Sequence, residues 1–247
     1  MPRHDWPLPA VLAHRCGGTL APENTLAGLD AALGNACGGV EFDVMLSGSG
    51  SPVLIHDETL ERTTNGRGPV ADTPDEILRA LDAGAWFDRR FAGEPLPTLE
   101  AAAARCKALG LAVNLEIKPS EGAEEATAEV VVRRARELWA GASELLLSSF
   151  SERALEVAAT LAPELRRGLL VSAIPKDWQM RCRRLGVVAL HVAHKHLDAT
   201  NVAAVRDAGL WVVAYTVNDP LRARTLFEWG VDCVITDRPD IVRSLRP

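Results

Sequence analysis

Charged side chains interrupt two apolar runs of this sequence at a spacing of two residues. Glu41 and Asp43 lie in VEFDVML, and Glu116 and Lys118 lie in AVNLEIKP. If both runs are β-strands, each pair projects from one face, because successive strand residues point to opposite sides. Burying such groups costs free energy unless they are paired or bound to a metal. We therefore expect a functional site where these two runs meet.

Glu41, Asp43 and Glu116 offer only oxygen ligands, a set that suits one hard divalent cation, Mg²⁺ or Ca²⁺, better than zinc. Without a cation, three gathered carboxylates would repel and raise one another's pKa. The alternative is that they are structural ion-pair partners of Arg15 and Lys118. Because buried ion pairs alone stabilise a fold only weakly, we favour the cation site.

Two histidines are expected beside this cluster, His14 at the end of the first apolar run and His56 in the run PVLIHD. An imidazole pair can divide into a general base and a general acid near neutral pH. Arg15 and Lys118 add the local positive charge that binds phosphate. Tyr215, the only tyrosine, either lines the pocket or fills the barrel. We expect the three histidines of LHVAHKHLD to be structural, although the first could point inward.

Apolar runs alternate with helical stretches along most of the chain, which is typical of a parallel sheet with crossover helices. The expected parallel strands are Ala10 to Arg15, Gly39 to Val44, Ala112 to Lys118, Glu144 to Ser149, Arg167 to Ser172, Val187 to Val192, Trp211 to Val217 and Asp232 to Thr236. The expected helices include Asn24 to Ala36, Thr98 to Leu109, Ala123 to Trp139, Glu152 to Leu161, Asp198 to Ala208 and Pro220 to Trp229.

The length of 247 residues suits an α/β fold of the (β/α)8 TIM barrel type. No G-x-G-x-x-G follows the first strand, and the charged residues fall near the C-terminal ends of several strands. Both features favour the closed barrel over an open doubly wound sheet. We expect residues 1–247 to form a single domain, with an insertion at about 58–97 that caps one end of the barrel and contains a short helix at Pro74 to Ala83.

A ninth apolar run, residues 52–57, follows the second strand after a Ser-Gly-Ser-Gly-Ser turn. Parallel strands need a dozen or more connecting residues, whereas a short glycine-rich loop makes a hairpin. We therefore expect an antiparallel β-hairpin arm after strand 2. A pairing in which residue numbers sum to 97 would place Leu54 opposite Asp43 and His56 opposite Glu41.

Composition excludes several classes of protein. Hydrophobic residues make up 47% of the chain and charged residues 24%, as in a soluble globular protein. The net charge of -6 argues against nucleic acid or anionic membrane as a partner. No apolar run approaches a membrane span, and Met1 to Leu12 lacks the features of a secretory signal, so we expect a cytoplasmic protein without stable membrane association. The five scattered cysteines suggest neither disulfides nor a zinc site.

Five motifs in this order and spacing resemble the glycerophosphodiester phosphodiesterase family, most of all its cytosolic bacterial enzyme: His14-Arg15, Pro22-Glu23-Asn24-Thr25, Glu41-Phe42-Asp43, His56-Asp57 and Asn114-Leu115-Glu116-Ile117-Lys118. The resemblance extends nearly to the C-terminus. It implies a barrel with a small insertion, a divalent metal, and hydrolysis of glycerophosphodiesters from deacylated phospholipids to sn-glycerol 3-phosphate and an alcohol.

The resemblance also implies a role for each site residue. It makes Glu41, Asp43 and Glu116 metal ligands, and His14 and His56 the acid/base pair. Arg15 and Lys118 would contact the phosphate or the glycerol, and Phe150 and Tyr215 would flank the substrate. Two positions depart from the family, since Cys16 stands where glycine is usual and Tyr215 where many members carry tryptophan. Cys16 bears on how closely the backbone approaches the ligand, and Tyr215 on the preferred alcohol.

Our hypothesis for the reaction is that one histidine removes the proton of the glycerol 2-hydroxyl, which attacks phosphorus to give a cyclic phosphate. The other histidine protonates the departing alcohol, and water then opens the ring. One alternative is a phospholipase of the phosphatidylinositol-specific or sphingomyelinase D type, which would have to act on a membrane surface. Another is a non-catalytic glycerol-phosphate-binding sensor. The sequence does not indicate which histidine acts first as base, or the oligomeric state.

Overall fold

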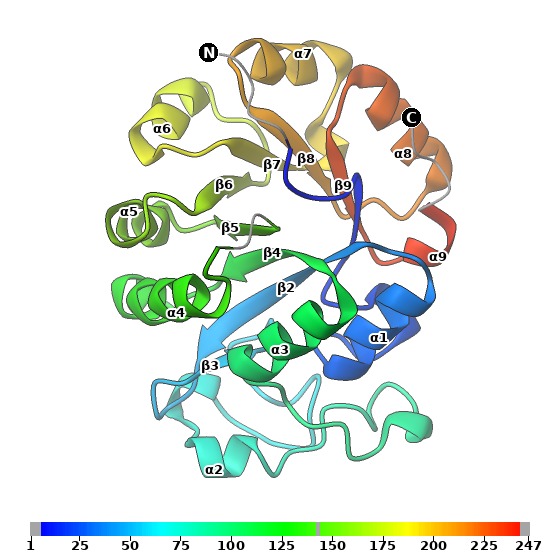
Figure 1. The fold of residues 1–247 in the computed structure, drawn as a ribbon, viewed down its shortest axis with the longest axis vertical. Coiled ribbons are helices and arrows are strands. Elements are labelled where there is room, and N and C mark those ends of the chain that lie inside the picture. The colour runs from blue at the N-terminus through cyan, green and yellow to red at the C-terminus, as the bar shows by residue number, and fades with distance from the viewer. Residues whose placement is uncertain (1–5, 142–143, 243–247) are drawn as a thin grey trace.

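The computed structural model describes residues 6–141 and 144–242. Residues 1–5, which begin the Met1 to Leu12 segment on which the cytoplasmic expectation rests, lie outside this part. Eight parallel strands close into a barrel, since the first pairs with both the second and the last. They are β1 (Val11–Ala13), β2 (Gly39–Leu46), β4 (Ala112–Ile117), β5 (Leu145–Ser149), β6 (Arg166–Val171), β7 (Ala189–Ala193), β8 (Trp211–Tyr215) and β9 (Cys233–Thr236). The predicted TIM barrel is confirmed (Figure 1).

Helices lie outside this ring of strands, and all but the last of them lie between successive strands of the barrel (Figure 1). They are α1 (Leu26–Gly34), α3 (Leu99–Leu109), α4 (Glu124–Leu138), α5 (Glu152–Leu161), α6 (Trp178–Leu185), α7 (Ala199–Asp207), α8 (Pro220–Trp229) and α9 (Pro239–Val242). Helix α1 begins later than expected, because Thr25 caps it by accepting a hydrogen bond from the backbone N–H of Gly28. Helix α6 was not among the predicted helices. Its sequence WQMRCRRL buries only Cys182 and Leu185, so its apolar periodicity is weak.

The arm after β2 is antiparallel, as predicted, but its register differs by one residue. Strand β3 (Pro52–Leu54) pairs Leu54 with Val44, not with Asp43. The connecting loop has an odd number of residues, because the hydroxyl of Ser47 accepts hydrogen bonds from the N–H groups of Ser49 and Ser51 and closes a loop centred on Ser49. The predicted pairing of His56 with Glu41 is therefore wrong, and His56 lies beyond the end of β3.

Residues 58–97 lie beside this arm, outside the ring of strands (Figure 1). Their helix α2 (Asp75–Leu78) is shorter than the predicted Pro74 to Ala83. The predicted end of the helix lies instead in a turn, where the N–H of Ala83 donates to the carbonyl of Glu94 and the Asp82 carboxylate accepts hydrogen bonds from the N–H groups of Gly84, Ala85 and Gly93. The segment is attached to the arm through an apolar cluster of buried side chains: Met45, Val53, Ile55, Leu60, Val70, Leu78, Ala83 and Leu96.

Two apolar layers stabilise the barrel. The larger lies between the strands and the surrounding helices and includes Phe42, Leu115 and Leu147. The smaller fills the barrel interior and includes Leu12 and Leu146. Strand side chains alternate between the two layers, so the neighbours of each inward-pointing residue point outward and join the larger apolar layer. Several inward positions near the C-terminal strand ends are occupied by polar side chains.

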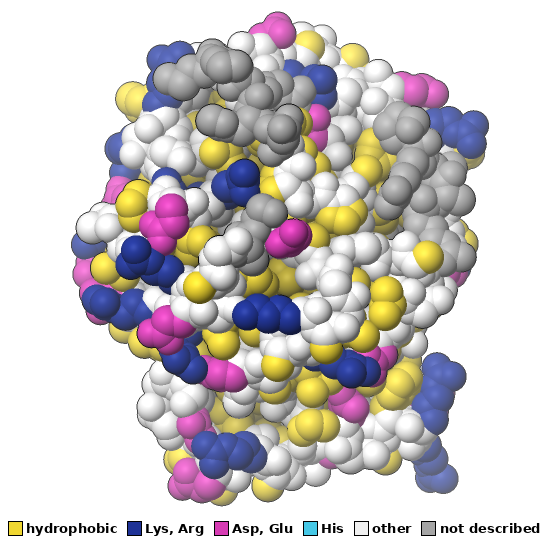
Figure 2. All heavy atoms as spheres, viewed as in Figure 1, with side chains coloured by type: hydrophobic (Ala, Val, Ile, Leu, Met, Phe, Trp, Pro, Cys, Tyr) yellow, Lys and Arg dark blue, Asp and Glu magenta, His cyan; other side chains and the backbone are white. Residues whose placement is uncertain are grey.

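Basic and acidic side chains are interspersed over the face shown in Figure 2, without a large patch of one sign. Among the described residues, no helix has the length and apolar character needed to cross a bilayer. All five cysteines are buried and free.

Candidate active site

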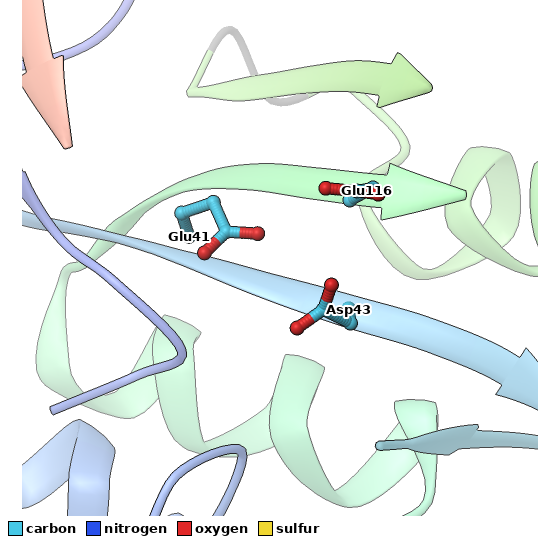
Figure 3. A group of neighbouring side chains, drawn as sticks. All are labelled: Glu41, Asp43 and Glu116. Atoms are coloured by element: carbon cyan, nitrogen blue, oxygen red, sulfur yellow. The ribbon is translucent and has the colours of Figure 1, made fainter. Parts of the chain in front are cut away.

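Three carboxylates converge at one end of the barrel, two from β2 and one from β4 (Figure 3). Asp43 and Glu116 are direct partners in the parallel register, and Glu41 lies two residues before Asp43 on the same inward face. Carboxylate oxygens of all three lie within 4.8 Å of one another, and all three side chains are buried. The two-residue spacing therefore produces the cluster predicted from the sequence.

The cluster fits a hard divalent cation, because its donors are all carboxylate oxygens. Burial, followed by the charge of Asp43, raises the pKa of Glu41 to about 7. The same two causes, in the same order, raise the pKa of Glu116 well above its usual value. Hydrogen bonds offset part of the free-energy cost of burying these carboxylates together. Glu41 accepts one from the backbone N–H of Arg15 at 3.0 Å, and Asp43 accepts one from the Asn24 amide at 3.0 Å. A bound cation would relieve the remaining repulsion.

His14 follows β1 directly, and its ring is held by a residue at the end of β9, the last strand of the barrel, which pairs with β1. Its Nδ1 lies 2.6 Å from the carboxylate of Asp237, the residue that follows β9, and its Nε2 lies 3.9 Å from a carboxylate oxygen of Glu41. Burial lowers the pKa of His14, but the hydrogen bond to Asp237 and the charge of Glu41 outweigh burial and raise it overall. Asn218 also donates a hydrogen bond to Asp237, at 2.8 Å.

His56 reaches the same pocket from the arm, and it too has a carboxylate partner. Its Nδ1 lies 2.7 Å from Asp57. Burial lowers the pKa of His56, and the charge of Asp43 and the hydrogen bond to Asp57 only partly compensate. Since a carboxylate accepts from Nδ1–H in each case, Nε2 is the nitrogen without a proton in the neutral form of both histidines.

Two cationic side chains stand beside the carboxylates. Arg15 Nε lies 3.7 Å from Asp43, and Lys118 Nζ lies 3.9 Å from Asp43 and 4.0 Å from Glu116. Both line the pocket. They place positive charge where an anionic substrate would enter a protein that is acidic overall.

An aromatic pair forms the outer wall of the pocket. The rings of Phe150 and Tyr215 meet edge to face, with centroids 6.0 Å apart. The hydroxyl of Tyr215 donates a hydrogen bond to the carbonyl of Val171 at 2.9 Å, which holds its ring in place. Phe150 is 47% exposed, so the wall it forms opens to solvent. The structure thus brings all nine predicted site residues to one pocket.

Residues expected to be structural lie elsewhere. His191 is buried inside the barrel against Gly168, and burial lowers its pKa to about 3. Residues 194–196 form a short 3-10 helix away from the pocket lining. Cys16 has a φ of 75° and is fully buried, with its Cβ packed close to Gly28. Its side chain therefore points into the core, and the position usual for glycine adds no group to the pocket.

Several supporting residues were assigned no individual role in the sequence analysis, although Glu23 and Asp57 belong to its motifs. Asp57 and Asp237 hold the two histidines. Glu23 accepts a hydrogen bond from Arg15, and Arg62 donates one to Asp57. Asp237 directly follows a buried strand, as His14 does, and this signal could have identified it. Arg62 is one of five arginines in the insertion at 58–97, and no pattern distinguishes it from the others.

Comparison with known proteins places this pocket in context. The Glycerophosphoryl diester phosphodiesterase family matches residues 14–241. A glycerophosphodiester phosphodiesterase of Caldanaerobacter subterraneus is 33% identical over 236 residues, 95% of this chain and 96% of the relative. The solved structure of an Oleispira antarctica phosphodiesterase in complex with the product sn-glycerol-3-phosphate is 42% identical, with a TM-score of 0.94 and 96% of each chain covered. That of a glycerophosphodiester phosphodiesterase from Agrobacterium tumefaciens is 29% identical, with a TM-score of 0.79, 96% of this chain covered and 100% of the other.

Proposed function

Because the chain belongs to the glycerophosphoryl diester phosphodiesterase family, we propose that its pocket hydrolyses glycerophosphodiesters to sn-glycerol 3-phosphate and an alcohol with the help of one divalent cation. The observation that carries this proposal is the buried carboxylate cluster, which shares one pocket with two carboxylate-held histidines. The product bound to the Oleispira antarctica phosphodiesterase supports the same choice of substrate here.

Glu41, Asp43 and Glu116 would hold the cation, either Mg²⁺ or Ca²⁺. Bound there, it would neutralise charge on the phosphoryl oxygens and help to orient the diester. Arg15 and Lys118 would contact the same anionic group from the side, since a guanidinium and an ammonium both donate to phosphate oxygens.

His14 and His56 would transfer the protons. One imidazole removes the proton of the glycerol 2-hydroxyl, whose oxygen forms a bond to phosphorus as the bond to the alcohol oxygen breaks. The other imidazole, protonated at Nε2, donates that proton to the departing alcohol. In the second stage water adds to the cyclic phosphate, its proton returns to a histidine, and the 2-oxygen leaves with a proton. Asp237 and Asp57 would keep both rings oriented throughout.

Phe150 and Tyr215 would lie against the alcohol part of the substrate. Their wall is apolar and partly open, so it would contact many alcohol groups without a specific hydrogen bond. The glycerol phosphate half would instead meet the charged end of the pocket.

Release of sn-glycerol 3-phosphate from glycerophosphocholine tests the proposal. We expect activity to disappear with chelator and to return with added Mg²⁺ or Ca²⁺. His14→Ala and His56→Ala should each lower kcat by a factor on the order of 10² to 10⁴. His196→Ala, the same change at an exposed histidine away from the pocket, should leave kcat unchanged. Near-normal turnover in either pocket variant would remove that histidine from the scheme.

A further inference from the structure

An unbroken series of polar contacts links His56 to Arg15 outside the pocket wall. Asp57 accepts from His56 Nδ1 at 2.7 Å and from Arg62, whose Nε lies 2.5 Å and whose Nη2 lies 3.0 Å from the two carboxylate oxygens. On its other side, Arg62 donates to Glu23 through Nη1 and Nη2, both at 2.7 Å. Glu23 in turn accepts from Arg15 Nη1 at 2.8 Å. The side chain that connects the acid/base candidate to the phosphate-binding candidate is Arg62.

Arg62 is suited to this connection by its shape. A guanidinium presents five N–H groups in a rigid plane, so it can grip two carboxylates with paired hydrogen bonds at once. A lysine ammonium carries the same charge on one atom and cannot fix the directions of two partners. The contacts lower the pKa of Asp57, mainly through the hydrogen bond from Arg62. They also hold the pKa of Glu23 below its usual value, although burial opposes this.

Exposure limits what each ion pair of Arg62 contributes to stability. Its side chain is 44% exposed, and an isolated ion pair that reaches solvent typically stabilises a fold by less than about 1 kcal/mol, while a bidentate network such as this one contributes more than a single isolated pair. Arg62 is also absent from the residues that line the pocket. Its bidentate grip on two functional carboxylates therefore has a better explanation in the geometry of the site.

We propose that Arg62 is a positioning residue that sets the orientation of His56 and Arg15 together; this rests on the proposed function. Without Arg62, Asp57 loses its anchor and no longer fixes the His56 ring, which lowers kcat. Glu23 keeps Arg15 as its single described cationic partner, so the Arg15 guanidinium is drawn toward Glu23 and away from the substrate phosphate. The second effect weakens substrate binding and raises KM.

Variants that break the series on either side of Arg62 separate these two effects. Asp57→Asn weakens the contact to His56 and one of the two carboxylate contacts of Arg62 but leaves the Arg62–Glu23–Arg15 contacts in place, so kcat should fall with KM nearly unchanged. Glu23→Gln weakens the contact to Arg15 and the other carboxylate contact of Arg62 but leaves the Arg62–Asp57–His56 contacts in place, so KM should rise with kcat nearly unchanged. Arg62→Ala should do both, with kcat lowered about 10²-fold, the scale expected for a misplaced catalytic group, and KM raised about 10-fold.

Arg105→Ala is the matched control. Arg105 is 43% exposed and pairs with Asp30 between α3 and α1, far from the pocket lining. It should leave kcat and KM unchanged and show a melting temperature close to that of Arg62→Ala. Arg62→Lys should recover less than a tenth of the lost kcat/KM, whereas methylguanidinium added to Arg62→Ala should restore activity with saturation.

The experiment measures glycerol 3-phosphate release from glycerophosphocholine by the cation-loaded protein, with melting temperatures for every variant. If Arg62→Ala is folded and retains the wild-type kcat and KM, the positioning role is wrong. It is also wrong if Arg62→Lys is fully active, because charge alone would then suffice. If the wild-type protein itself releases no glycerol 3-phosphate, the proposed function fails instead, and the two failures are distinguished.

Discussion

Replacing Glu116 with glutamine should stabilise the metal-free protein at about pH 8, whereas replacing Asp43 with asparagine should destabilise it. Both changes remove one negative charge from the same cluster. Their effects differ because the two carboxylates have different neighbours. Glu116 has one cation within 4.0 Å, Lys118, whereas Asp43 has Lys118 at 3.9 Å and Arg15 at 3.7 Å.

Coulomb's law gives the expected size of each effect. At an effective dielectric constant of about 20, two charges at the upper limit of 4.8 Å that bounds the separations in the cluster repel by about 3.5 kcal/mol, and opposite charges near 4 Å attract by about 4 kcal/mol. Glu116→Gln removes two repulsions and one attraction, so the metal-free protein should gain about 3 kcal/mol. Asp43→Asn removes two repulsions and two attractions, so it should lose about 1 to 2 kcal/mol.

The sign of the pH dependence provides a second check. Burial raises the pKa of Glu116 above its value in the unfolded chain, so the folded state holds a proton that the unfolded state releases. Stability from this group is therefore lost as pH rises above about 4.5. The raised pKa favours the protonated, glutamine-like form of Glu116 at lower pH, so the advantage of Glu116→Gln should be smaller at about pH 5 than at about pH 8.

Urea unfolding with excess chelator, at about pH 5 and pH 8, measures these differences. The reasoning is refuted if Glu116→Gln and Asp43→Asn change the free energy of unfolding in the same direction at pH 8. It is also refuted if the advantage of Glu116→Gln is as large at pH 5 as at pH 8. Both variants should lose cation-dependent activity, so Glu116→Gln should gain stability and lose function at the same time.

Three further predictions concern the cation, the histidine partner and the aromatic wall. Cation at a hundred times its Kd should stabilise the protein by about 2.7 kcal/mol. Thermal melting measures this gain in stability. The gain should be smaller at pH 6 than at pH 8, because Glu41, with a pKa of about 7, must lose its proton to bind the cation. Asp237→Asn should lower kcat at least 10²-fold by releasing His14, whereas Asp240→Asn, which breaks an ion pair with Arg238, should leave kcat unchanged. Phe150→Ala should raise KM severalfold for bulky alcohol groups, with less than about 1.5 kcal/mol lost in stability; an unchanged KM for every diester would contradict that role.

Much of the barrel could be predicted from the sequence because its strands are short apolar runs buried on both faces. The carboxylate cluster could be predicted equally well, because two residues spaced two apart on a strand lie on the same face. The hairpin register was not, because it depended on hydrogen bonds that the hydroxyl of Ser47 makes within its own turn. Helix α6 escaped prediction because only two of its residues, Cys182 and Leu185, are buried, so its apolar periodicity is weak.

The contacts that orient the site were the least predictable part. His14 and Asp237 are 223 positions apart in the chain, and only the closed barrel makes them neighbours. Arg62 lies five residues from Asp57 and 39 from Glu23, with no strand or helix periodicity to relate them. Patterns along one element reveal which side chains share a face, but they carry no information about partners supplied by another element.

The pairing of β9 with β1 has a consequence for how this protein is made. During synthesis the carboxylates of β2 and β4 emerge early, but the partner of His14 emerges among the last described residues. Contacts between such distant positions form late, because closing so long a loop is entropically costly. A nascent chain could therefore bind the cation well before it can orient His14. Catalytic competence would then arise only when the final strand docks, which makes turnover a direct report of completed folding.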